Sequence, residues 1–147
     1  MMPLGVATTV AETTKIDFRY RRMTEIGDIT DLVGILFPGN RNQQHAAARI
    51  LLWLKAAKGP VLTLARLERQ HSISRRTLQR TRAKLARLGL IEYASPLNSR
   101  HGGQVGWVLS SRVSTALRQL ADRIDDWRRD TRPERREKDE RLVAVLK

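Results

Sequence analysis

The chain has 147 residues, 41% of them hydrophobic, and its 28 Lys and Arg against 15 Asp and Glu give a formal net charge of +13. This length suits one domain with appendages or two very small domains, and the apolar fraction excludes a wholly disordered chain. So strong a positive charge favours polyanions as partners, nucleic acid first and acidic membrane surface second.

The absence of cysteine excludes disulfides, thiolate zinc sites and a cysteine nucleophile, and it fits a reducing compartment. The N-terminus lacks the basic and apolar regions of a signal peptide, and the longest apolar stretches, such as ILLWL, are too short to cross a bilayer. We therefore expect a soluble cytoplasmic protein that has no membrane partner.

Residues 1–39 predict an N-terminal arm followed by an amphipathic helix. The basic run KIDFRYRRM fits an arm that lies along DNA or, as we favour, a solvated terminus. The helix is expected from Thr24 to Phe37, where Pro38 and Gly39 end it. Its apolar face consists of Ile29, Leu32, Val33 and Leu36.

The next segment predicts the helix that forms the floor of a small core. QQHAAARILLWLKAA begins near Asn42 and is ended by KGP. Its apolar stripe consists of Ala47, Ile50, Leu51 and Leu54, with Trp53 at the margin. Val61 and Leu62 are expected to be extended, and Thr63 is expected to N-cap a two-turn helix, LARLERQH.

A strongly cationic helix is predicted from Arg75 to Leu88. Ser72 suits a turn, Ser74 is a good N-cap, and Gly89 can end the helix in the left-handed conformation. The helix holds six Arg or Lys, no acid occurs from 69 to 91, and its buried face is expected at Leu78, Leu85 and Leu88. Because a solvated helix face normally mixes both charge signs, this pattern favours nucleic acid as the partner.

After Gly89 the apolar period changes from helical to alternating. LIEYAS and QVGWVLS predict two strands of a hairpin, joined by the turn-rich loop PLNSRHGG. Residues 112–131 return to a helical period, and 132–147 form a charged tail with an apolar end. The helix has a two-heptad apolar seam that suits part of a dimer interface. The seam consists of Val113, Leu117, Leu120, Ile124 and Trp127.

The order helix, short strand, helix, tight turn, helix, glycine and hairpin resembles the winged helix-turn-helix fold of prokaryotic and archaeal regulators of the MarR and GntR kind. The stretch TLARLERQHSISRRTLQRTRAKLARLGLIEY carries the likeness, which covers Asn42 to Ser111. The fold class implied is mainly α with a small β-hairpin: an N-terminal arm and helix (1–39), a winged helix-turn-helix domain (40–111), a dimerisation helix (112–131) and the tail (132–147). Arg82 departs from the pattern, which has an apolar residue there; its stem is expected to run along the edge of the core.

The resemblance implies that one face of the 75–88 helix packs on the domain and the other enters the DNA major groove. Its N-terminal turns would meet base edges, and Lys84 and Arg87 would contact phosphates. The loop 96–103 would be the wing, on the minor groove or the backbone. The expected DNA contacts are Thr63, Ser72, Ser74, Arg75, Arg76, Gln79, Arg80, Arg82, Lys84, Arg87, Arg100 and His101.

No constellation for catalysis is evident in the sequence. His45, His71 and His101 lack metal-ligand spacing, and HGGQVG is not a phosphate-binding loop before a helix. We therefore expect a binding protein rather than an enzyme, without a metal or other cofactor.

Three functions remain open. The first is a sequence-specific regulator of transcription, bound to double-stranded DNA as a homodimer and therefore associated with the nucleoid. The second is an architectural, plasmid-partition or replication-initiation DNA-binding protein, for which binding would be broad and salt-sensitive. The third is a docking module for an acidic protein, which would show little affinity for duplex DNA.

Overall fold

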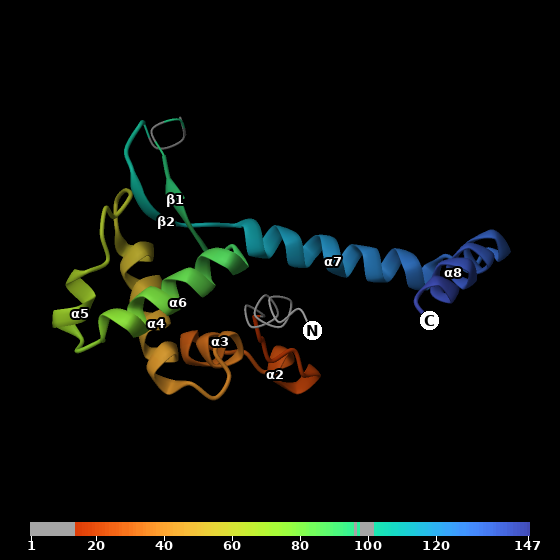
Figure 1. Ribbon diagram of the computed structural model, residues 1–147, viewed down its shortest axis with the longest axis horizontal. Helices are drawn as coiled ribbons and strands as arrows, with labels where there is room; N and C mark the ends of the chain where they lie inside the picture. The colour runs from red at the N-terminus through yellow and green to blue at the C-terminus, as the bar shows by residue number, and fades with distance from the viewer. Residues whose placement is uncertain (1–13, 96, 98–101) are drawn as a thin grey trace, which may run out of the picture. The chain divides into compact units, whose positions relative to one another are not determined.

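The computed structural model describes residues 14–95, 97 and 102–147, and it divides the chain into two compact units, Met1–Ser110 and Ser111–Lys147. Within the described residues the protein is mainly helical and has a two-stranded antiparallel sheet (Figure 1). The first unit contains α2 (Tyr20–Thr24), α3 (Ile29–Leu36), α4 (Arg41–Ala56), α5 (Arg66–Gln70), α6 (Arg75–Leu88), β1 (Ile91–Ala94) and β2 (Gly106–Leu109). The second contains α7 (Arg112–Arg129) and α8 (Pro133–Val145).

The N-terminal segment forms two helices where the sequence predicted one. The helix expected from Thr24 begins instead at Ile29, because Asp28 and Asp31 form a capping box. The Asp28 carboxylate accepts the N–H groups of Thr30 (2.9 Å) and Asp31 (3.1 Å), and the Asp31 carboxylate accepts the N–H of Asp28 (3.3 Å). These bonds fix the start of α3, so α2 is a separate short helix that the apolar period did not predict.

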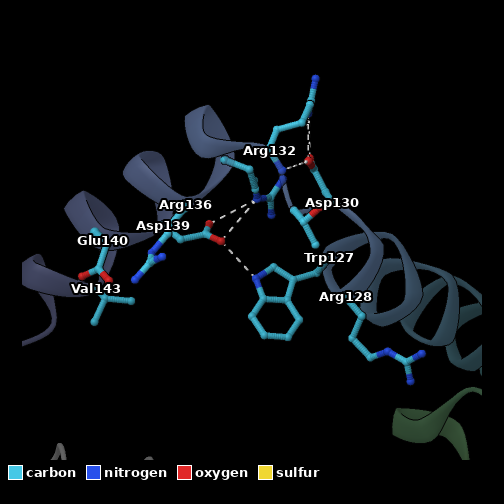
Figure 2. A pocket seen from close by; sticks show the side chains of 10 residues that line it. Trp127, Arg128, Asp130, Arg132, Arg136, Asp139, Glu140 and Val143 are labelled. Atoms are coloured by element: carbon cyan, nitrogen blue, oxygen red, sulfur yellow. Dashed lines mark hydrogen bonds and ion pairs between the residues drawn. The ribbon is translucent and has the colours of Figure 1, made fainter.

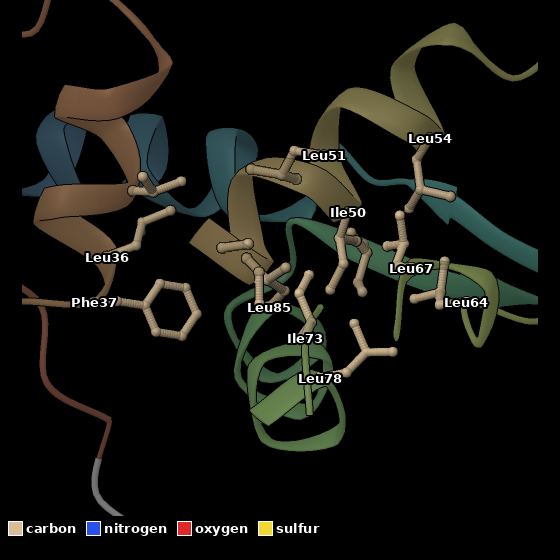
Figure 3. Close-up of a cluster of buried hydrophobic side chains, with 14 residues drawn as sticks. Leu36, Phe37, Ile50, Leu51, Leu54, Leu64, Leu67, Ile73, Leu78 and Leu85 are labelled. Atoms are coloured by element: carbon tan, nitrogen blue, oxygen red, sulfur yellow. The ribbon is translucent and has the colours of Figure 1, made fainter. Parts of the chain in front are cut away.

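Helix α4 is the centre of the core, as predicted. Its first turn is capped by Asn40, whose side chain accepts the Gln43 N–H (3.0 Å). Its buried side packs against α3, α6 and β2. Figure 3 shows side chains from several elements gathered around Ile50, among them Leu78 and Leu85 of α6. Each fully buried aliphatic side chain of this cluster contributes about 1.5–3 kcal/mol to folding.

The connection from α4 to α6 differs in part from its prediction. Helix α5 begins at Arg66, and the Thr63 hydroxyl accepts the Ala65 N–H (3.2 Å) ahead of the helix, so Thr63 does not cap it. Ser72 makes the predicted turn with a positive φ of 54°. The Ser74 side chain accepts the Thr77 N–H (3.1 Å), which confirms it as the N-cap of α6.

Gly89, with φ of 88°, ends α6 as predicted, and the hairpin follows. Strands β1 and β2 pair from Ile91 with Leu109 to Ala94 with Gly106. Val61 adds an extended bridge, because it exchanges backbone hydrogen bonds with Trp107 (3.0 and 2.7 Å). A Cβ at Gly106 would lie 2.7 Å from the Val61 backbone, so only glycine permits this approach.

The second unit is a pair of helices. The segment predicted as a charged tail forms α8, which begins with Pro133 at a position where proline favours helix initiation. Trp127 Nε1 of α7 donates to Asp139 Oδ2 of α8 (3.0 Å), as Figure 2 shows. Asp139 also pairs with Arg135 (3.2 Å). Throughout 111–147, all of which the structure describes, no side chain is buried.

Candidate nucleic-acid interface

Helix α6 has a buried side and an exposed side. The buried residues are Leu78, Thr81 and Leu85, so the third core position is Thr81 and the apolar site expected at Arg82 is displaced by one residue. The Thr81 hydroxyl has no hydrogen-bond partner among the described residues. The exposed residues are Arg75, Arg76, Gln79, Arg80, Ala83 and Arg87. At 100° per residue these six positions cover one continuous stripe, which we call the outer stripe.

The middle of the outer stripe is available to a ligand. The side chains of Arg76, Gln79 and Arg80 make no hydrogen bond or ion pair with any residue that the structure describes. Arg75 lies 3.6 Å from Glu68, and its side chain is 76% exposed, so this ion pair holds it only weakly. Arg87 Nε donates to the Thr14 hydroxyl (3.4 Å), a contact at the far end of the stripe.

One flank of the outer stripe is braced by Arg82. Its guanidinium lies over the Trp107 ring, 5.1 Å from the centroid, and Trp107 meets Tyr93 edge-to-face at 5.2 Å. The sequence did not predict this ladder, although Tyr93 and Trp107 are partners in the hairpin register. Arg82 therefore connects α6 to the hairpin.

The other flank is held by Lys84, which the sequence predicted as a phosphate contact. Its Nζ donates to the carbonyl oxygens of Leu36 and Lys15 and lies 4.5 Å from the centroid of the Phe37 ring. Burial, assisted by the charge of Arg87, lowers the pKa of the ammonium below its usual range. Because the ammonium is engaged inside the first unit, we leave Lys84 out of the proposed contact surface.

Two small recesses adjoin the N-terminal half of α6. One, of about 260 Å³, brings together Thr63, Arg75, Gln79 and Arg82. The other, of about 180 Å³, is lined in part by Ser72 and Ser74, with Asn42, His45, Ile73 and Thr77. The Ser74 hydroxyl already caps the helix and donates to the Thr77 hydroxyl (2.9 Å), so Ser72 is the freer of the two serines.

His45 and His71 lie together beside the second recess. Their ring centroids are 6.3 Å apart, and Arg49 Nε donates to His45 Nε2 (3.3 Å). Burial, then the charges of Arg49 and His45, lower the pKa of His71. Within the described residues, no three His, Asp or Glu side chains are grouped to hold a metal ion.

The remaining predicted residues belong to the hairpin loop and α7. Arg100 and His101 lie outside the described residues. In α7, the predicted seam lies on one face, where Leu117, Leu120, Ile124 and Trp127 are 44–56% exposed and Val113 is partly exposed. Within the second unit, this degree of exposure leaves the apolar face of α7 largely uncovered.

Positive charge is concentrated in the first unit. Residues 1–110 contain 17 Lys or Arg and 7 Asp or Glu, whereas 111–147 contain 11 and 8. No helix in the described part of the chain is long and apolar enough to cross a membrane. No protein-family model, curated protein or solved structure matches this chain.

Proposed function

We propose that the protein binds double-stranded DNA through the outer stripe of α6 and regulates transcription from specific sites. The observation that carries the proposal is that Arg76, Gln79 and Arg80 are exposed and unpartnered among the described residues. Arginine can pair with guanine O6 and N7, and glutamine with adenine N6 and N7, each good contact being worth about 1–3 kcal/mol of discrimination. Ala83, at the centre of the stripe, has a short side chain, which favours close approach of the helix to base edges.

In this proposal the first unit is a winged helix-turn-helix domain and α6 is its recognition helix. The bracing of α6 by Arg82 on one side and Lys84 on the other supports it, since readout requires a helix held in a fixed orientation. The wing is the loop 96–103, with Arg100 on the minor groove or backbone, and Arg87 contacts phosphate.

The proposed DNA-bound form is a homodimer that uses the exposed apolar face of α7. Two recognition helices would then enter successive major grooves about 34–36 Å apart, and the preferred site would be pseudo-palindromic. The mixed charges of the second unit support a role in protein contact, because they repel a second copy less than the first unit does.

A second candidate is an architectural protein that coats DNA. It is favoured by the cations of the first unit outside α6, which would add phosphate contacts without sequence preference. These cations include Arg41, Lys55, Lys58, Arg66 and Arg69.

Recovery and sequencing of sheared genomic DNA bound to the purified protein at about 150 mM salt would test both. A few sharp pseudo-palindromic peaks would support the regulator, and even coverage would support the architectural protein. If no DNA is recovered, both are contradicted, and docking on an acidic protein becomes the better hypothesis. The matched control is Arg118→Ala, which removes an exposed arginine of α7 and should leave the recovered fragments unchanged.

A further inference from the structure

The first unit has an apolar groove that the proposed DNA contacts do not use. Its volume is about 630 Å³, and the N-terminal end of α3, the C-terminal half of α4 and the end of β2 line it. Leu52 and Leu109 in its wall are 47% and 43% exposed, and Asp28 and Lys55 stand at its edge. The other apolar lining residues are Ile26, Ile29, Leu32, Leu51 and Leu90.

The second unit has the complementary shape, a convex apolar stripe. Val113, Leu117, Leu120, Ile124 and Trp127 follow one face of α7, which at 18 residues is about 27 Å long. None of them is buried. Two heptads are too few to hold two chains together through α7 alone. The stripe therefore needs a larger surface to bind than a second stripe.

We propose that the α7 stripe of one copy docks in the groove of a second copy, and that the exchange is reciprocal. This inference rests on the dimer of the proposed function and names its contact surface. An amphipathic helix in an apolar groove is a recurring mode of recognition, with anchors spaced as the α7 stripe is. Reciprocal docking closes a two-fold dimer and covers this groove and the α7 stripe in both copies.

The amount of apolar surface favours this exchange over a seam between two α7 helices. A seam covers five stripe side chains in each copy, whereas the exchange covers those five together with Ile26, Leu52 and Leu109, the groove side chains that are 43–47% exposed. Stable interfaces bury about 1,200–2,000 Å², which two separate helix-in-groove contacts reach more readily than one short seam. The lining contains no residue of α6, so the outer stripe stays available to DNA.

The first test is the mass of the protein in solution, without DNA. The wild-type chain should be a dimer, and both Leu52→Glu in the groove and Leu120→Glu in the stripe should raise the dimer dissociation constant at least about 100-fold. Leu62→Glu is the matched control, because Leu62 is 64% exposed and outside the groove. All three positions are exposed, and circular dichroism should show that each variant keeps its helical content.

The second test uses the absence of native cysteine. A Leu52→Cys copy mixed with a differently tagged Leu120→Cys copy should form a mixed cross-link with a short bis-maleimide. A cross-link only between two Leu120→Cys copies would overturn the proposal in favour of a seam, and a monomeric wild-type chain would overturn it altogether. Neither result depends on DNA, so a mixed cross-link with no recovery of genomic DNA would reject the proposed DNA function and leave the dimer standing.

Discussion

Helices α6 and α7 share a similar pattern of basic and apolar residues, but they differ in which face is exposed. Both are cationic and amphipathic, with six basic residues in α6 and five in α7. In α6 the apolar side is buried against α4, and the side chains of Arg76, Gln79 and Arg80 on the polar side have no partner among the described residues, whereas in α7 it is the apolar side that is exposed. A similar pattern therefore leaves different faces available for binding.

The acidic residues distinguish the two helices further. Helix α6 has none, whereas α7 has Asp122, Asp125 and Asp126 among its arginines. Uncompensated positive charge attracts a polyanion, and a mixture of signs lets two protein surfaces approach without strong repulsion. The comparison thus predicts an anionic partner for α6 and an apolar partner for α7.

The largest expected effect is on stability, where substitutions in the apolar faces of α6 and α7 should act differently. Leu85→Ala removes a fully buried side chain from α6 and should lower the free energy of unfolding by about 2–5 kcal/mol, whatever the protein concentration. Leu117→Ala, at a position 44% exposed, should destabilise only through the dimer. Urea unfolding at two protein concentrations measures both. A concentration-independent loss for Leu117→Ala would contradict the contrast between the helices.

The next effect is on DNA affinity, where substitutions in the polar faces of α6 and α7 should act differently. Replacing both Arg76 and Gln79 with alanine should weaken binding to the recovered site by about 1–3 kcal/mol per lost contact and leave binding to scrambled duplex much less affected. Arg118→Ala on α7 should change neither affinity. Fluorescence anisotropy on both duplexes gives the comparison. Equal losses on specific and scrambled DNA would mean that these side chains contact phosphate and do not read sequence.

Two cations of α6 should behave differently, because one lies on the outer stripe and the other beside it. Lys84→Met removes two hydrogen bonds to carbonyl oxygens and should destabilise the fold by about 1–2 kcal/mol, without changing the salt dependence of DNA binding. Arg80→Ala should leave stability nearly unchanged and flatten the salt slope by about one unit if it neutralises one phosphate. A flatter slope for Lys84→Met would return that residue to the DNA surface.

The features that could be predicted from the sequence are those that depend on residues close together in the chain. Ser74 and Gly89 set the limits of α6 through hydrogen bonds and backbone angles within a few residues, and the alternating period set the hairpin. Lys84 could not be placed in this way, since the two carbonyl groups it binds are 48 and 69 residues away in the chain. The recognition role of α6 itself remains a prediction.

The differences between the expected and the observed helices have local causes. The capping box at Asp28 overrides a longer apolar period and separates α2 from α3. The tail after Pro133 forms α8 although its apolar residues do not follow a helical face; Leu142, Val143 and Val145 are 57–80% exposed. The core position of α6 was placed at Arg82 because a buried threonine gives no apolar signal.

The smallest expected effect is on the free energy of unfolding, from a substitution of Thr81 on the buried side of α6. Thr81 is fully buried and its hydroxyl has no partner in the described part of the protein, which costs folding about 1–3 kcal/mol relative to a solvated hydroxyl. Valine has nearly the same shape and no polar atom, so Thr81→Val should raise the free energy of unfolding by about 1 kcal/mol. Urea unfolding measures this gain, and DNA affinity should not change, because the outer stripe is untouched. A loss of stability would show that the hydroxyl has a hydrogen-bond partner, such as an internal water, and that this polar group on the buried side of α6 stabilises the fold.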